Sequence, residues 1–391
     1  MKQPIGRLTL ILGALAAFAP MSIDMYLPGL PALARAFDTG VGAVQLTLSA
    51  FFAGLVCGQI FYGPLADRYG RRRPLAAGIA LYVLASAGCA LAPDLPALIA
   101  LRFVQALGGC AGLVISRTMV RDLFDAQESA RMFSLIMLVM GAAPILAPLA
   151  GGVLLVNFGW QSIFWALALF GLLVLAACAA WMPETQRTRA ASLGVAESSR
   201  AYAGMLADRR FLGYALAGGF AQAGMFAYIT GSPSVFIDLN GVPPEHYGWL
   251  FGGNAFGLIA ASQLNRRLLI GHPARDVLVR ANQVNTGFGV LLLLSALTGA
   301  GGFAGLLVPL FGYVASLGFI GPNATALALS HQGQRAGSAA ALLGTLQFAL
   351  AALASAALGI VQQASAVPMA LAIAVCGALA LAAHVLVRAR G

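Results

Sequence analysis

The sequence has very little charge. Only 9% of its 391 residues are Asp, Glu, Lys or Arg, and Lys2 is the sole lysine. Soluble domains usually carry about 25% charged residues, so this chain has too few to cover a water-exposed surface. Its hydrophobic content of 60% fits a lipid environment instead. We therefore expect an all-α membrane protein with no sizeable soluble domain.

The sequence also lacks the motifs of several enzyme classes. It has no G-x-x-x-x-G-K-[ST] loop for ATP, and its polar residues outside the apolar runs show no metal-ligand spacing. Its 5 cysteines all fall inside apolar runs and indicate no disulfide framework. A membrane enzyme such as a lipid-linked transferase would need clustered acid, base or metal-binding groups. We thus expect no enzyme activity, no cofactor and no metal.

Apolar runs recur along the whole chain and are long enough to cross a bilayer as helices. They lie at about 8–30, 43–65, 74–93, 97–117, 132–156, 160–182, 211–233, 246–265, 276–298, 302–325, 336–359 and 367–387. These runs predict twelve transmembrane helices. A polar stretch at 183–210 separates an N-terminal six-helix bundle at 1–182 from a C-terminal six-helix bundle at 211–391, an organisation typical of transporters built from two repeats.

The basic residues predict the orientation. With both termini in the cytoplasm, nearly all of the 23 Lys and Arg residues lie on the cytoplasmic side, and only Arg35 and Arg102 do not. The formal net charge of +10 would suggest nucleic acid as the partner of a soluble protein. Here the placement of the charge predicts membrane orientation, with a lipid bilayer and no nucleic acid as partner.

Two ionisable residues lie well inside apolar runs. Asp24 is in the outer half of the first run, and Arg102 is in the outer half of the fourth. Charges inside a membrane are costly and usually functional. Asp24 could exchange a proton for a substrate, or it could have a structural role, either capping a helix break before Pro28 or lying at the membrane interface. Arg102 could take part in proton coupling, or it could bind backbone carbonyls and hold its helix in place.

A loop with ordered glycines and an acid joins the second and third runs. It reads Gly63-Pro64-Leu65-Ala66-Asp67-Arg68-Tyr69-Gly70-Arg71-Arg72-Arg73. A simple positive-inside loop needs neither the glycines nor the acid. The loop resembles the signature loop of the major facilitator superfamily, G-x-L-a-D-r-x-G-r-r.

Three further stretches resemble the same superfamily. The segment Arg102-Phe103-Val104-Gln105-Ala106 is similar to its helix-4 motif, with Ala106 where glycine is usual. The fifth run resembles the antiporter motif of drug:proton exporters at Pro144, Ala147, Pro148, Gly151 and Gly152, with Ala147 replacing the usual glycine. The stretch from Ile23 to Pro31 looks like helix 1 of the Bcr/CflA drug-resistance subfamily.

The resemblance implies an alternating-access carrier with roles for particular residues. Asp24 and Arg102 correspond to the residues implicated in proton coupling. Gly63, Asp67, Arg68, Gly70 and Arg71 correspond to a gate loop. Among uncharged polar residues in the runs, we rank Tyr26, Gln105, Tyr228 and Asn254 first for substrate binding, although each could equally be a tie between helices.

The sequence therefore predicts a proton-coupled antiporter that exports drugs or similar amphipathic small molecules. The alternative is an exporter or symporter of a specific metabolite on the same fold, which the altered Ala147-Pro148 pair keeps open. Protons and a small-molecule substrate are the expected partners. We expect a monomer in the cytoplasmic (inner) membrane of a bacterium.

Overall fold

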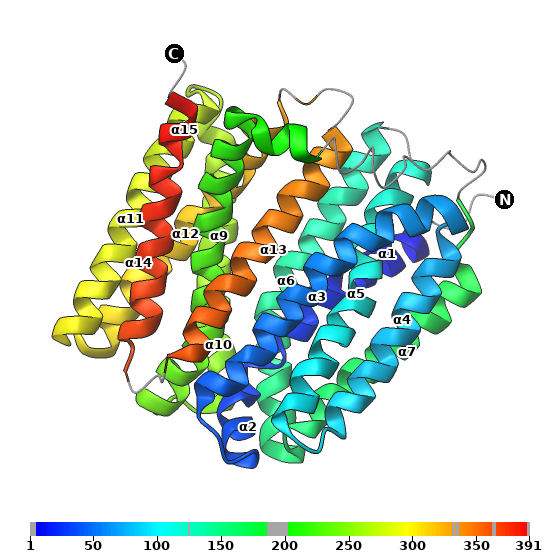
Figure 1. The fold of residues 1–391 in the computed structure, drawn as a ribbon, viewed down its shortest axis with the longest axis horizontal. Coiled ribbons are helices and arrows are strands. Elements are labelled where there is room, and N and C mark those ends of the chain that lie inside the picture. Colours follow the sequence, from blue (N-terminus) through cyan, green and yellow to red (C-terminus); the bar gives the residue numbers. More distant parts are fainter. Residues whose placement is uncertain are drawn as a thin grey trace. The chain divides into compact units, whose positions relative to one another are not determined.

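The computed structural model describes residues 5–123, 126–185, 202–330, 332, 336–361 and 365–388, and these ranges are helical and contain no strand (Figure 1). The first half comprises α1 (Ile5–Asp24), the 3-10 turn η1 (Leu27–Gly29), α2 (Leu30–Ala36), α3 (Val41–Tyr69), α4 (Arg72–Ala90), α5 (Leu95–Leu123), α6 (Ala126–Phe158) and α7 (Gln161–Trp181). The second comprises α9 (Arg209–Pro233), the π-helical η2 (Ser234–Leu239), α10 (Pro244–Leu268), α11 (Ala274–Thr298), α12 (Gly302–Leu329), α13 (Ala336–Ile360), α14 (Val367–Ala382) and α15 (His384–Arg388).

Ten of the twelve apolar runs each fall on a single helix, whereas the first run spans α1, η1 and the start of α2, and the last spans α14 and α15. Within the described residues, nine helical spans are long and apolar enough to cross a membrane, and Ala142–Phe158 is a shorter apolar helix. The helices α9 and α10 are not among the nine, because glycine in α9 and polar side chains in α10 lower the hydropathy. The full set of twelve spans with cytoplasmic termini stays a prediction.

The chain forms two compact units. The first comprises Met1–Thr39, Leu46–Leu193 and Pro244–Gly248, and the second comprises Gly40–Gln45, Gly194–Pro243 and Trp249–Gly391. Their main boundary falls inside the polar stretch 183–210. The division into bundles at 1–182 and 211–391 stays a proposal, since the short segments 40–45 and 244–248 are grouped differently.

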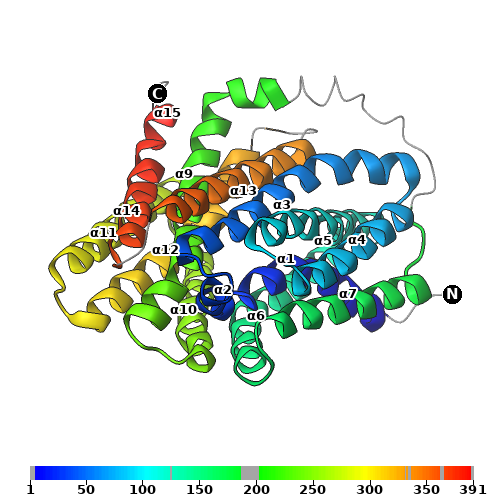
Figure 2. The same cartoon turned by 60° about the horizontal axis from the view of Figure 1, so that its bottom comes forward.

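The two units repeat one packing pattern. In the first, α1 packs against α5, α6 and α7, and α4 packs against α5 and α7. In the second, α9 packs against α12, α13 and α14, and α11 packs against α12 and α14. Figures 1 and 2 show the neighbouring pairs α4 and α7, and α11 and α14, from two directions. The same neighbours recur at corresponding positions, as expected of a structural repeat.

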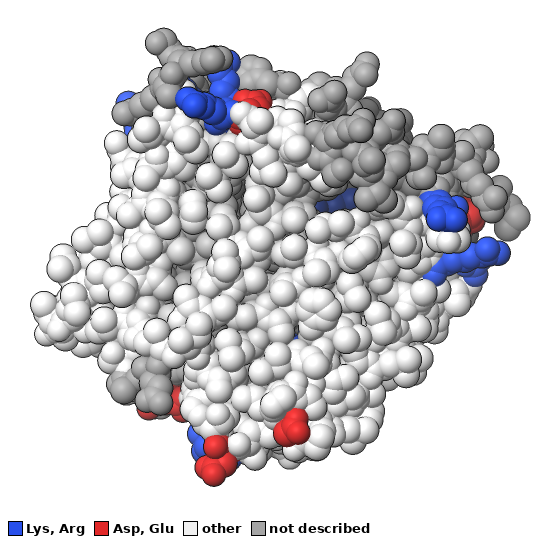
Figure 3. All heavy atoms as spheres, viewed as in Figure 1, with Lys and Arg blue, Asp and Glu red and all other residues white. Residues whose placement is uncertain are grey.

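Small residues bring the helices close together. A side chain at Gly54 of α3 would meet the carbonyl of Phe103 on α5, and one at Gly318 of α12 would meet the carbonyl of Leu258 on α10. Such contacts are typical of helices that pack in membranes. Figure 3 shows the complementary outer surface, which is white along the helices and carries most of its charged side chains at their ends.

Candidate functional site

The first membrane helix breaks at Asp24. Helix α1 ends there, and the chain continues through η1 and α2. In a continuous helix, the carbonyl of Asp24 would accept a hydrogen bond from the amide four residues later, but that residue is Pro28, which has no N–H. Pro31 in the same way leaves the carbonyl of Leu27 without a helical donor. The sequence itself therefore ends α1 at the one acid of its apolar run.

Asp24 is buried at this break. Only 4% of the residue is exposed, and among the described residues its side chain forms no hydrogen bond or ion pair. It also lies at the C-terminal end of α1, where the helix dipole opposes a negative charge. An ionised carboxylate in such a place is costly unless a partner stabilises it.

Arg102 of α5 is fully buried in the same unit. Its guanidinium carbon lies 4.6 Å from the ring centroid of Tyr26 and 4.3 Å from that of Phe51. Nη2 donates to the carbonyl of Ser22 at 3.1 Å, and Nη1 donates to Gln105 Oε1 at 2.5 Å. Nε is buried without a partner. No ion pair joins Arg102 to Asp24, so stacking on the two aromatic rings and two hydrogen bonds stabilise this cation.

A chain of hydrogen bonds fixes the groups around Arg102. Gln105 Nε2 donates to Ser86 Oγ at 2.8 Å, and Ser86 Oγ donates to the carbonyl of Tyr82 at 2.7 Å. The hydroxyls of Tyr82 and Ser22 are 2.7 Å apart. This chain links α1, α4 and α5. Gln105, predicted to bind substrate, has both ends of its amide engaged here; Ser22, Tyr82 and Ser86 were not singled out by the sequence.

Tyr26 provides one of the aromatic rings that contact the Arg102 guanidinium. Its ring packs against Phe164 with centroids 5.4 Å apart, and its hydroxyl lies 2.9 Å from Thr47 Oγ1. The side chain is fully buried. Asp24 and Tyr26 are separated by one residue on the broken segment, and Tyr26 connects that segment to the Arg102 cluster.

The stretch that resembles the antiporter motif lies against the break in α1. A side chain at Gly151 of α6 would collide with the carbonyl of Met25, the residue after Asp24. Ala147, Pro148, Gly151 and Gly152 are buried, and Pro144 is half-buried. Two motifs distant in the sequence thus meet at the proposed proton site.

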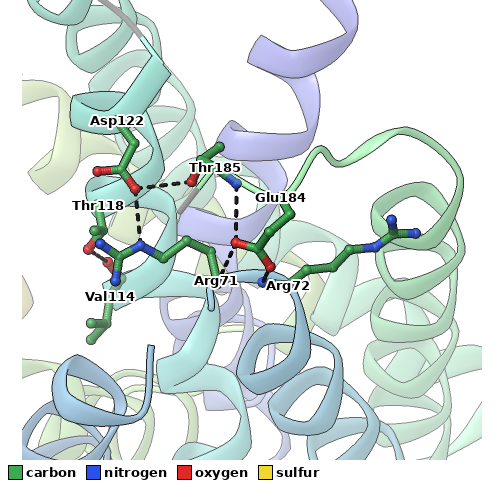
Figure 4. A network of polar contacts seen from close by, with 7 residues as sticks. All are labelled: Arg71, Arg72, Val114, Thr118, Asp122, Glu184 and Thr185. Atoms are coloured by element: carbon green, nitrogen blue, oxygen red, sulfur yellow. Dashed lines mark hydrogen bonds and ion pairs between the residues drawn. The ribbon is translucent and has the colours of Figure 1, made fainter. Parts of the chain in front are cut away.

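A polar network lies where α3 and α5 end and α4 begins (Figure 4). The carboxylate of Glu184 accepts from the backbone amides of Arg71 at 2.9 Å and Arg72 at 3.1 Å, at the start of α4. A carboxylate there also complements the helix dipole. Arg71 Nε donates to Asp122 Oδ2 at 3.0 Å, and the same oxygen accepts from Thr185 Oγ1.

The network contains part of the predicted gate loop. Gly70 makes the turn between α3 and α4 with φ at 87°, and a side chain there would meet the Glu184 carboxylate. Arg68 is exposed over the ring of Tyr69, and Gly63 has open space around it. The side chain of Asp67 lies outside the described residues. The sequence prediction missed Asp122 and Glu184, which are distant from the arginine-rich loop in the sequence and lie beside it only in the structure.

In the second unit, two predicted substrate-binding residues meet. Asn254 Nδ2 of α10 donates to the hydroxyl of Tyr228 of α9 at 3.0 Å, and both residues are buried. Tyr228 stacks on Phe251 with ring centroids 5.4 Å apart and planes 20° apart. The pair provides an aromatic face and an amide in one place.

A family model described as Major Facilitator Superfamily matches residues 12–356. The chain belongs to this superfamily. Among curated relatives, the MFS-type transporter YdgK of Bacillus subtilis is 38% identical over 367 residues, covering 93% of this chain and 90% of the relative. The bicyclomycin resistance protein homolog of Haemophilus influenzae is 32% identical over 382 residues, covering 97% and 96%. These relatives confirm the resemblance to the Bcr/CflA branch.

Solved structures of other transporters have the same fold as this chain. The crystal structure of a D-xylose-proton symporter superposes with a TM-score of 0.78 at 14% identity, covering 99% of this chain and 98% of the other. That similarity concerns the fold alone. The chain is therefore a multi-pass member of a transporter family.

Proposed function

We propose that the protein is a proton-coupled antiporter that exports drugs or similar amphipathic small molecules from the bacterial cytoplasm. The observation that carries the proposal is the buried carboxyl of Asp24, which has no partner among the described residues and sits at a proline-induced break. The similarity to a protein named for bicyclomycin resistance supports the substrate class.

In the proposed cycle, Asp24 binds a proton when its site opens to the outside and releases it when the site opens to the cytoplasm. Each pH unit supplies about 1.4 kcal/mol, and each charge that crosses adds about 2.3 kcal/mol per 100 mV. One proton per cycle is thus enough to expel a neutral compound against a gradient of about tenfold or more.

The other predicted residues have supporting roles in this proposal. Arg102 keeps a fixed positive charge next to α1, and it positions the break through the carbonyl of Ser22. Tyr26 and Gln105 in the first unit, and Tyr228 with Asn254 in the second, supply aromatic and hydrogen-bonding groups for substrate. The loop of Gly63, Asp67, Arg68, Gly70 and Arg71 acts as the cytoplasmic gate. The protein works as a monomer in the inner membrane.

The test is expression in an efflux-deficient bacterium challenged with a panel of unrelated antimicrobials. We expect lower susceptibility to several compounds, and an uncoupler should restore their accumulation. An exporter or symporter of one metabolite, the alternative function, would leave the whole panel unchanged while altering the level of one compound. Protection that survives the uncoupler would contradict proton coupling.

A further inference from the structure

Three helices of the second unit enclose an apolar groove. It has a volume of about 370 Å³ and is lined by α10, α11 and α12, with Val284, Phe288, Ala315 and Phe319 among its walls. Gly312 also lines it, packed so closely on the ring of Phe288 that no side chain would fit. The groove lies within one unit and shares no residue with the sites described above.

The outer face of this groove is suited to lipid. Helix α11 packs against α12 and α14, and its other side carries exposed apolar residues. Val284 in the groove is 51% exposed, and Leu291 and Leu294 farther along α11 are 46% and 52% exposed. In a membrane-spanning helix, such side chains face acyl chains.

One end of the groove is basic. Arg280 and His272 line it, and both are exposed. Among the described residues Arg280 forms no ion pair, although Asp276 lies one helical turn earlier. Arg266, Arg267 and Arg275 flank the same α10–α11 connection. By the positive-inside rule this end lies at the cytoplasmic surface, where anionic lipids are attracted by basic side chains.

The length of the groove matches one leaflet. Along α11 its lining extends from Val277 to Phe288, which is about 16 Å at the helical rise of 1.5 Å per residue. Half of a bilayer's hydrocarbon core is about 15 Å thick. An acyl chain that enters beside Val277, about one helical turn before Arg280, would therefore end near Phe288, at the middle of the membrane.

We propose that this groove is a binding site for one anionic phospholipid of the cytoplasmic leaflet. Arg280 binds the headgroup phosphate, and the walls of α10, α11 and α12 hold an acyl chain. The occupant follows from the combination of an unpaired cation at the membrane surface with an apolar channel one leaflet long. The site does not depend on the proposed drug export.

The test is native mass spectrometry of the delipidated full-length protein, titrated with phosphatidylglycerol or phosphatidylcholine. We expect one preferential phosphatidylglycerol site. Arg280→Gln should weaken phosphatidylglycerol binding about fivefold, since one basic side chain near an anionic surface contributes about 1 kcal/mol. Arg210→Gln, an exposed arginine at the start of α9, is the matched control and should leave binding unchanged.

Two variants test the apolar part. Ala315→Phe fills the groove from its wall, and Val284→Trp covers it from an exposed position. Either should weaken both lipids. Wild-type phosphatidylglycerol binding in Arg280→Gln, or in a folded Val284→Trp, would overturn the proposal. Equal affinity for both lipids in the wild type would also overturn it, because the groove would then hold any acyl chain without regard to charge.

Discussion

The backbone of Gly151 packs directly on the carbonyl of Met25, with no room for a side chain between them. Met25 follows Asp24, so helix α6 presses on the residue next to the buried acid. Any shift of α6 along this contact must displace the broken end of α1. The contact therefore provides a physical link between the antiporter stretch and the proposed proton site.

We predict that Gly151→Ala destabilises the protein by about 1–3 kcal/mol, the usual cost of overpacking, and abolishes transport. Gly253→Ala on α10 is the control, because a side chain there meets open space and alanine favours a helix. Melting temperatures in detergent and export from cells measure the two effects. A Gly151→Ala protein with wild-type stability and export would show that α6 and the backbone at Met25 can move apart without cost.

Asp24→Asn should uncouple transport from protons. The amide keeps the shape of the side chain but cannot gain or lose a proton, so efflux from proteoliposomes should no longer respond to an imposed pH gradient. Exchange of labelled for unlabelled substrate should continue, since it needs no net proton movement. Asp276→Asn, at an exposed position on α11, is the control and should behave as wild type. A pH response that survives in Asp24→Asn would place the proton site elsewhere.

Arg102→Lys should lower stability although the charge is kept. Lysine has no planar fork, so it cannot bind Ser22 and Gln105 while stacking between Tyr26 and Phe51. We expect a loss of about 2 kcal/mol, measured by thermal unfolding, because a hydrogen bond to a charged group contributes about 1.5–3 kcal/mol. Arg275→Lys, which changes an exposed arginine, should have no effect. An unchanged melting temperature for Arg102→Lys would argue that the observed stacking adds no stability.

The ion pair of Arg71 and Asp122 should contribute only modestly. The side chains are 10% and 26% exposed, and exposed pairs typically contribute about 0.2–1 kcal/mol. A double-mutant cycle of Arg71→Ala and Asp122→Asn should give a coupling energy in that range, falling at 1 M salt. Each single variant should lose most of its transport although its free energy of unfolding changes little, because the pair lies in the proposed gate. Additive effects on stability would mean that the contact contributes nothing.

The sequence predicted the positions of the helices well, because the length of an apolar run is a local property that the bilayer selects. It also identified Asp24 and Arg102 as the unusual membrane residues. Their separate environments were not predictable. Whether Arg102 faces Asp24, Ser22 or Gln105 depends on how far α5 is rotated about its axis, and hydropathy carries no such information.

The cytoplasmic network shows the same limit. The side chain of Asp67, the acid of the predicted gate loop, lies outside the described residues. The ion pair that the structure provides joins Arg71 to Asp122, and Glu184 adds the cap of α4. These residues come from three distant segments. The sequence identified the arginine-rich loop that contains Arg71, but it did not show that α5 would bring Asp122 next to it.

The prolines after Asp24 also solve a problem of length. The apolar span from Leu8 to Ala36 contains 29 residues, which as one straight helix would be about 44 Å long. A hydrocarbon core of about 30 Å could hold such a rod only at a tilt of about 46°, beyond the usual range for membrane helices. By folding the end of the span into η1 and α2, the break removes this hydrophobic mismatch. Replacing Pro28 and Pro31 by alanine would restore it, and the protein would then have to thicken or distort the membrane around its first helix.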